Sequence, residues 1–185
     1  MALTYTPAAA QDFICPDFDL PSVDGRRFAL KDFSASDALV VMFICGHCPY
    51  VQAIEDRLIA VAREFMPQGV AVVGICANDP ADYPEDTPKA LHQRWLEKHY
   101  NFPYLIDGSQ EVAKAFGAVC TPDLYVFDRQ RKLHYRGRLD DSWRHPDKVT
   151  RRELADAITA VLKNHAVESV QNPAMGCSIK WKLGD

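Results

Sequence analysis

The sequence has no long hydrophobic run, no long basic run and no signal-like start. None of its apolar stretches approaches the roughly 20 residues that a helix needs to cross a membrane. Its net charge is −4, from 21 basic and 25 acidic residues mixed along the chain. We therefore expect neither a nucleic-acid partner nor a membrane partner. No Lys or Arg precedes Arg26 and the first residues hold no apolar core, so a secretory signal is not expected either.

Cysteine is too sparse for a fold held together by disulfides. The 185 residues contain 6 cysteines, scattered at positions 15, 45, 48, 76, 120 and 177. A chain of this length with 48% hydrophobic residues can fill a core without such links. The cysteine content therefore predicts a reducing compartment, which we take to be the cytoplasm, with one functional pair and several free thiols.

The functional pair is expected at Cys45 and Cys48. An apolar run over residues 39–44 predicts a buried strand, and it leads directly into Cys45-Gly46-His47-Cys48. Helical periodicity begins after Pro49. The start of a helix offers unpaired N–H groups and partial positive charge, which favour thiolate over thiol. A C-x-x-C motif between a strand and a helix is typical of a redox site.

The rest of the chain alternates strands and helices, which predicts a single α/β domain. The two apolar strands that flank the helix after the motif form a βαβ unit and should be parallel. The expected elements are a short hairpin about the turn at 24–25, a helix over 51–65, a strand over 70–77, a surface loop over 78–88, a helix over 89–100, a strand over 102–106, a helix over 110–116, a hairpin over 124–135, a loop over 142–147 and a helix over 150–164.

Four blocks of sequence resemble the thioredoxin superfamily, and more narrowly its peroxiredoxin-like, AhpC/TSA-related branch with a C-x-x-C motif. They are PDFDLPSVDG at 16–25, FICGHCPYV at 43–51, GAVCTPDLYVFD at 117–128 and MGCSIKWK at 175–182. The resemblance implies a thioredoxin fold, in which helices flank a central mixed β-sheet, with an N-terminal β-hairpin extension. It makes residues 1–185 one domain, with a poorly ordered lead-in at 1–12, an insertion at 78–100 and a C-terminal tail at 167–185.

The resemblance also implies a substrate face beside the dithiol. Thr121-Pro122 corresponds to the cis-proline loop that faces the two cysteines in this superfamily. The backbone before that proline pairs with a bound peptide or thiol substrate, as a short added strand.

These residues predict a thiol–disulfide oxidoreductase that needs no cofactor and no metal beyond its own cysteines. Cys45, expected to be the more exposed thiol, attacks a substrate disulfide, and Cys48 resolves the mixed disulfide. Gly46 and His47 tune the potential, because a histidine cation beside the thiolate lowers the thiol pKa. The expected partners are protein or small-molecule thiols and disulfides, with an electron donor that the sequence does not name.

Other readings of the motif stay open. Cys48-Pro49 resembles the Cys-Pro of peroxiredoxins, so either Cys48 or Cys45 could be the peroxidatic residue of a thiol-dependent peroxidase. Such an enzyme needs a hydroxyl where Cys45 stands and an activating arginine, for which the candidates are Arg129, Arg131, Arg136 and Arg138. A zinc site would need a second ligand pair, which the sequence lacks. A redox sensor or binding module without turnover is the remaining alternative.

Further residues are candidates near the site. Cys120 precedes the expected cis-proline by two positions, and Cys177 lies in a tail that could fold back to supply a resolving thiol. Tyr50 and Phe43 flank the dithiol and could line an apolar groove. Two departures from thioredoxin concern Ile44, which replaces the usual Trp, and Leu39, which stands where thioredoxin has a buried proton-relaying Asp.

Overall fold

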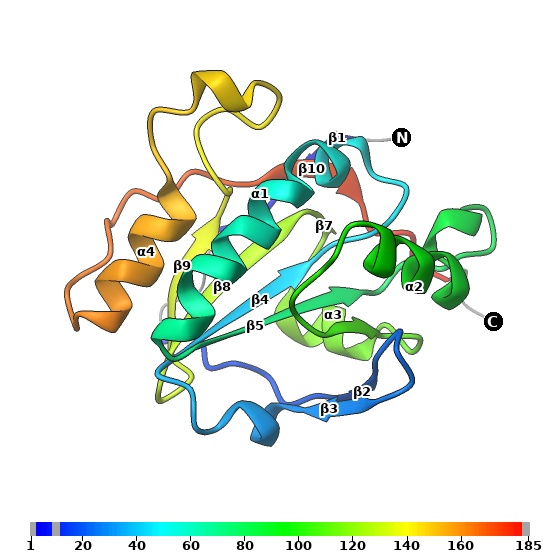
Figure 1. The fold of residues 1–185 in the computed structure, drawn as a ribbon, viewed down its shortest axis with the longest axis horizontal. Helices are drawn as coiled ribbons and strands as arrows, with labels where there is room; N and C mark the ends of the chain where they lie inside the picture. Colours follow the sequence, from blue (N-terminus) through cyan, green and yellow to red (C-terminus); the bar gives the residue numbers. More distant parts are fainter. Residues whose placement is uncertain (1–2, 9–11, 183–185) are drawn as a thin grey trace.

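The computed structural model describes residues 3–8 and 12–182, and its centre is a mixed five-stranded sheet (Figure 1). The strand order is β6-β5-β4-β8-β9. Strands β4 (Ala38–Phe43), β5 (Val70–Cys76) and β6 (Tyr104–Ile106) are parallel, whereas β8 (Asp123–Asp128) and β9 (Leu133–Gly137) add an antiparallel hairpin next to β4. The predicted mixed sheet and the parallel βαβ unit are confirmed.

Alternate residues of the central strand β4 face two separate cores. Val40 and Met42 pack under α1 (Pro49–Phe65), α2 (Pro88–Glu97) and α4 (Glu153–Leu162). Val41 and Phe43 pack on the opposite face, against α3 (Glu111–Phe116) and the N-terminal hairpin. Every residue of β4 is buried, which explains why its sequence shows a continuous apolar run and no alternation.

The N-terminal hairpin extension is present as predicted. Strands β2 (Asp19–Pro21) and β3 (Arg27–Ala29) pair in antiparallel fashion about a turn in which Gly25 has φ of 85°. A backbone with positive φ favours glycine there. Short 3-10 turns complete the secondary structure: η1 (Leu30–Phe33), η2 (Met66–Gln68), η3 (Pro84–Asp86) and η4 (Pro146–Lys148).

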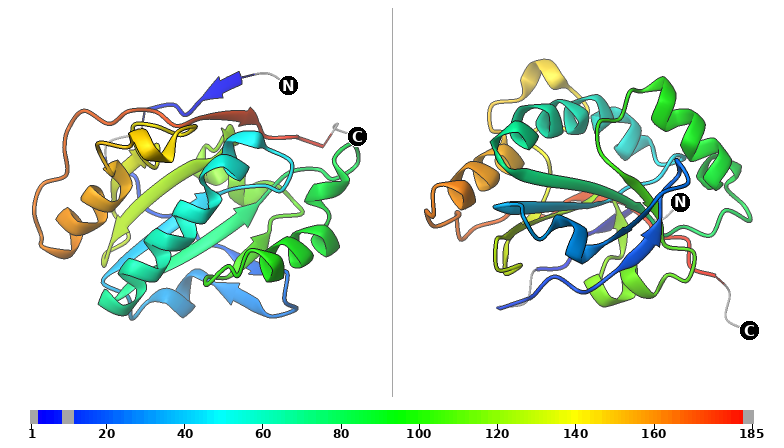
Figure 2. Two further views of the ribbon diagram at one scale, coloured as in Figure 1. Left: turned by 45° about the horizontal axis from the view of Figure 1, so that its top comes forward. Right: turned by 60° about the horizontal axis from the view of Figure 1, so that its bottom comes forward.

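The two ends of the chain form a second, smaller sheet, which the sequence analysis did not predict. In it, β10 (Met175–Ser178) pairs with β1 (Leu3–Tyr5) on one side and with β7 (Cys120–Thr121) on the other. Figure 2 shows β1 lying beside β10. The expected lead-in and tail are therefore wrong for residues 3–5 and 175–178, because backbone pairing orders them. Residues 1–2, 9–11 and 183–185 of those segments lie outside the described residues.

No helix in the described part of the chain is long and apolar enough to span a bilayer.

Candidate functional site

The fold places the dithiol at the junction of β4 and α1. Phe43 is the last residue of β4, and Cys48 is the N-cap residue of α1, with extended backbone (φ −76°, ψ 120°). Pro49 occupies the first helical position, where its missing N–H costs nothing. The predicted strand–C-x-x-C–helix arrangement is thus confirmed.

Both cysteines are free thiols, and both are buried. The exposed fraction is 1% for Cys45 and 0% for Cys48. Cys45 was expected to be the more exposed of the two thiols, but in the closed molecule the difference is only that between 1% and 0%. Two segments distant in sequence cover the motif: the loop of residues 78–86 on one side and β10 on the other.

The Thr121–Pro122 peptide is cis and faces the dithiol, as the resemblance implied. The Thr121 hydroxyl oxygen lies 3.1 Å from Cys45 Sγ. The Cys48 thiol donates a hydrogen bond of 3.2 Å to the carbonyl oxygen of Thr121. One residue therefore contacts both sulfurs, through its side chain and through its backbone.

The strand edge at Thr121 is occupied by the protein itself. Cys177 of β10 is the antiparallel partner of Thr121, and Ser178 is the partner of Cys120. The approach is close: a Cβ added to Gly176 would lie only 1.8 Å from the Thr121 carbonyl oxygen. In this structure the expected substrate edge is thus not free, because the chain's own C-terminal strand lies on it.

A buried carboxylate, Asp86, lies in the segment that was expected to be a surface loop. It is 2% exposed and accepts hydrogen bonds from the backbone N–H groups of Gly46 (2.7 Å) and His47 (3.1 Å). Its other oxygen lies 2.6 Å from His47 Nδ1 and accepts from Asn78 Nδ2 at 2.8 Å. The surface-loop prediction is wrong at these residues, because the loop turns inward to satisfy donors of the C-x-x-C segment.

The position of Asn78 in the chain was the available signal. It follows the end of β5, which is the parallel neighbour of β4, and Cys45 follows the end of β4. The carboxyl ends of parallel strands meet at one sheet edge, which is where ligand and catalytic groups gather in α/β proteins.

His47 is enclosed between Cys45, Asp86 and an aromatic ring. Its side chain is 4% exposed, its Nδ1 lies 3.6 Å from Cys45 Sγ, and its ring centroid lies 4.2 Å from that of Tyr83. Its Nε2 has no hydrogen-bond partner among the described residues. The histidine therefore belongs to the site and does not project into solvent.

The two thiols differ in acidity. Burial raises the pKa of Cys45, and the Cys48 sulfur and the Asp86 charge raise it further. The hydrogen bond from Cys45 lowers the pKa of Cys48 to about 5, against the effect of burial; the Cys177 thiol and the Val51 N–H add to this lowering. The pKa of Cys45 is thus raised overall, with burial as the largest cause, and the lowering expected from His47 stays a prediction.

The two auxiliary thiols proposed from the sequence have different surroundings. Cys177 is 2% exposed, and its thiol is hydrogen-bonded to Cys48. Cys120 is buried, and its Sγ lies 3.9 Å from the carbonyl oxygen of Pro122. Burial raises the pKa of Cys120 to about 12. The structure thus brings Cys177 to the dithiol and leaves Cys120 as a neutral thiol behind the cis-proline loop.

The arginines considered for a peroxidase are engaged elsewhere. Arg136 forms a buried ion pair with Asp123, and Arg138 pairs with Glu153. The other two contact groups near the opposite end of the sheet: Arg129 pairs with Asp37, and Arg131 donates to the carbonyl of Phe33.

Three donor atoms of Cys45, His47 and Asp86 lie within 4.8 Å of one another. Tetrahedral zinc takes four ligands, and this group among the described residues has three. Asp86 already accepts four hydrogen bonds there. The geometry therefore favours a hydrogen-bonded cluster over a metal centre.

An apolar groove of about 140 Å³ begins at Pro122, next to the dithiol. Tyr50 and Trp143 form one wall, with ring centroids 4.6 Å apart, and Tyr5 and Met175 also line it. Tyr50 thus lines a groove as considered from the sequence, whereas Phe43 is buried in the opposite core.

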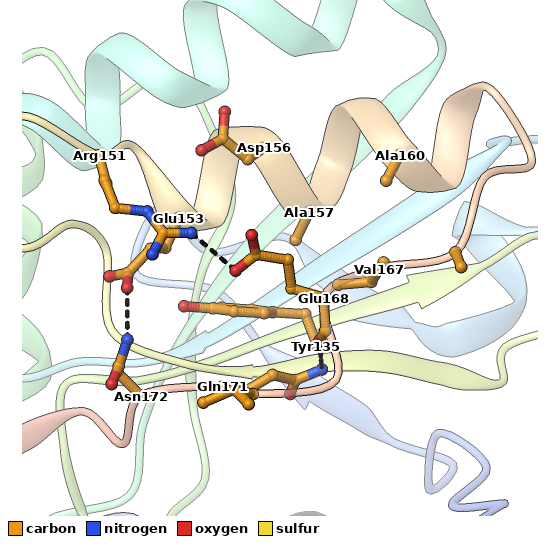
Figure 3. A pocket seen from close by; sticks show the side chains of 12 residues that line it. Tyr135, Arg151, Glu153, Asp156, Ala157, Ala160, Val167, Glu168, Gln171 and Asn172 are labelled. Atoms are coloured by element: carbon orange, nitrogen blue, oxygen red, sulfur yellow. Dashed lines mark hydrogen bonds and ion pairs between the residues drawn. The ribbon is translucent and has the colours of Figure 1, made fainter.

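A second cavity, of about 210 Å³, lies between α4 and residues 166–172 (Figure 3). Its polar side chains bind one another: Arg151 pairs with Glu168, and Asn172 donates to Glu153. None of its described lining residues is a cysteine, so it is separate from the thiol site.

Comparison with known proteins places the chain in a family. The family model for AhpC/TSA matches residues 13–136. An uncharacterized conserved protein from Geobacillus kaustophilus is 42% identical, with a TM-score of 0.94 and coverage of 100% of this chain and 99% of its own. A hypothetical protein from Sinorhizobium meliloti 1021 is 40% identical, with a TM-score of 0.92 and coverage of 98% and 100%.

A more distant likeness concerns the fold alone. A thiol:disulfide interchange protein of the thioredoxin family from Chlorobium tepidum TLS is 20% identical, with a TM-score of 0.58 and coverage of 70% of this chain and 87% of its own. No curated protein matches the chain. On the family match, this chain belongs to the AhpC/TSA family, and it shares the fold of the thioredoxin family protein.

Proposed function

We propose that the protein is a thiol–disulfide oxidoreductase whose redox-active pair is Cys45 and Cys48. The observation that carries this proposal is that two free thiols at the start of α1, Cys45 and Cys48, both contact Thr121 beside the cis-proline. Two sulfurs held together at a helix start can exchange between dithiol and disulfide with little movement of the backbone.

The acidities assign a role to each sulfur. Near neutral pH the charge resides on Cys48, and the Cys45 thiol donates a hydrogen bond to it. As Cys45 attacks one sulfur of a substrate disulfide, its proton passes to Cys48 and the other substrate sulfur leaves as thiolate. That thiolate then takes the proton from Cys48, and Cys48 attacks the mixed disulfide. The products are the Cys45–Cys48 disulfide, one substrate thiol and one substrate thiolate, which takes a proton from solvent.

Cys45 is assigned the attack because of what surrounds it. Its sulfur borders the Thr121 hydroxyl and the His47 ring, while Cys48 is enclosed by the start of α1, the Thr121 carbonyl and Cys177. In this proposal Gly46 and His47 tune the pair, and Asp86 and Asn78 hold His47 in place.

Substrate access requires local opening, because both sulfurs are buried in the closed molecule. The groove at Pro122 offers aromatic side chains to a thiol or disulfide bearing an apolar group. We propose protein or small-molecule thiols and disulfides as partners, in the reducing environment of the cytoplasm, where cysteines outside disulfides are stable.

The test is reduction of insulin disulfides with dithiothreitol as the electron donor. The wild-type protein should accelerate the reaction, and Cys45→Ser should abolish that acceleration. Cys120→Ser is the matched control, since it removes a buried thiol that donates to the carbonyl of Pro122, and it should retain activity. Absence of acceleration by the wild-type protein with insulin and with oxidised glutathione would argue for a redox sensor without turnover.

A peroxidase is the second candidate, favoured by the lowered pKa of Cys48 directly before Pro49. In that reaction Cys48 would attack peroxide and become a sulfenic acid, which a second thiol converts to a disulfide with loss of water. Peroxide consumption that persists in Cys45→Ser and disappears in Cys48→Ser would identify this activity. Against it stand the four arginines, all of which bind groups other than Cys48.

A further inference from the structure

Cys177 occupies a place that the two-cysteine reaction does not explain. Its strand β10 lies on β7, so that Cys177 is opposite Thr121, the residue that contacts both sulfurs of the dithiol. Its own thiol is buried and hydrogen-bonded to Cys48. Cys48 is therefore the middle member of a row of three sulfurs.

Backbone contacts on both edges of β10 hold Cys177 opposite Thr121. Gly176 brings β10 to a distance at which no side chain would fit against the Thr121 carbonyl. On its other edge β10 is held by β1, where Leu3 is the partner of Cys177 and Thr4 is the partner of Gly176. A residue with a purely packing role would not need this approach to the backbone beside the dithiol.

We propose that Cys177 is a third redox-active thiol, which exchanges with the Cys45–Cys48 disulfide to form a Cys48–Cys177 disulfide. The proposal rests on the function proposed above. In the exchange, the Cys177 sulfur attacks Cys48, the Cys45–Cys48 bond breaks, and Cys45 leaves as thiolate. Cys45 takes up the proton that Cys177 gives up. One disulfide is lost and one is formed, so the step consumes no external oxidant or reductant.

The exchange gives the protein two oxidised forms with different properties. In the first, Cys45 is locked in the disulfide. In the second, the disulfide links Cys48 to Cys177 of β10, and Cys45 is again a free thiol. Cys120, whose thiol donates to the carbonyl of Pro122, is not part of this exchange.

The test is disulfide mapping on full-length variants oxidised with oxidised glutathione, quenched in acid and digested without reduction. In Cys45→Ser, two thiols and one glutathione disulfide should yield a Cys48–Cys177 link and two reduced glutathione molecules. The same link should form in Cys45→Ser with Cys120→Ser, and it should be absent in Cys45→Ser with Cys177→Ser. A Cys48–glutathione adduct or a Cys48–Cys120 link in place of Cys48–Cys177 would overturn the proposal.

Wild-type protein provides the second measurement and separates this proposal from the proposed function. In a glutathione redox buffer it should contain both the Cys45–Cys48 and the Cys48–Cys177 peptides. A map with the Cys45–Cys48 link alone would refute the third thiol and leave the oxidoreductase intact. A Cys48–Cys177 link in a protein that reduces no disulfide substrate would refute the oxidoreductase and leave the link established.

Discussion

Several neighbouring groups act together on the ionisation of Cys48. When it is protonated, its thiol donates to the Thr121 carbonyl; when it ionises, the Cys45 thiol, the Cys177 thiol and the Val51 N–H surround the charge. The helix start contributes in the same sense, because its free N–H groups carry partial positive charge. The ionised form is therefore the favoured one near neutral pH although the residue is buried.

This arrangement predicts a thiolate that titrates near pH 5. The ultraviolet absorbance of thiolate in the reduced wild-type protein should rise with an apparent pKa of about 5, and Cys48→Ser should remove that transition. From about pH 5 to the ordinary cysteine pKa near 8.5, the folded protein binds fewer protons than the unfolded chain. The stability of the reduced wild-type protein relative to Cys48→Ser should thus increase with pH across this window. A first thiolate transition near 8.5 would contradict this account.

Asp86 predicts a second effect at the residue scale. Burial alone would raise the pKa of Asp86, but hydrogen bonds from His47 and Asn78 lower it overall. Replacing the carboxylate in Asp86→Asn should cost about 1–3 kcal/mol of unfolding free energy. It should also lower the pKa of Cys45, because a nearby negative charge is removed.

The stabilisation of the fold by Asp86 should be larger at neutral pH than at acidic pH. A carboxylate with a lowered folded pKa stabilises the protein above its unfolded pKa near 3.9, and this contribution is lost as the pH falls through the folded value. Urea unfolding should therefore show wild type more stable than Asp86→Asn at neutral pH, with a smaller difference at pH below about 4. Asp82→Asn, at an exposed position of the same loop, is the control and should change little.

At the scale of elements, we expect β10 to limit access to the thiols, because it pairs with β7 at Thr121. A Cβ at position 176 would collide with the Thr121 carbonyl, so Gly176→Ala should push β10 away from β7. Such overpacking costs about 1–3 kcal/mol, and alkylation of the dithiol by iodoacetamide should accelerate roughly 5- to 150-fold. Gly108→Ala is the matched control, because a Cβ there meets nothing within 4 Å. Equal alkylation rates in the two variants would show that β10 does not limit access.

Some of the helices and strands could be predicted from the sequence, and others could not. The long apolar runs predicted β4 and β5 correctly, and the amphipathic pattern after Pro49 predicted α1, since continuous and 3.6-residue periodicities are strong local signals. Strands β1 and β10 were not predicted, because a strand of three or four residues shows too little periodicity. Their order comes from backbone pairing with partners far away in the chain.

The site was predictable where its chemistry was local. Cys45, Cys48 and the segment up to the helix follow from one short motif, and the cis Thr121–Pro122 bond followed from the family resemblance. Asp86 could not be placed, because an acidic, proline-rich loop shows the same pattern whether or not one of its carboxylates turns inward. The burial of Cys45 was missed for the same reason: both of its covers come from distant segments.

For the whole molecule, the C-terminal strand links distant parts of the chain. In the chain-entropy description, a Cys48–Cys177 disulfide would close a loop of roughly 130 residues, worth about 5 kcal/mol. Oxidised Cys45→Ser should therefore melt at a higher temperature than its reduced form. The double variant Cys45→Ser with Cys177→Ser should melt at the same temperature under both conditions. Unchanged melting of a Cys48–Cys177-linked sample would indicate strain in the native state.

The long stretch of sequence between the dithiol and β10 has a consequence for the newly made protein. A ribosome adds about 5–20 residues per second, so the chain between the dithiol and β10 takes on the order of ten seconds to synthesise. During that interval Cys45 and Cys48 exist without the strand that later encloses them. The nascent chain therefore passes through a period in which these thiols lack the cover of β10, and the pairing of β10 with β7 ends that period.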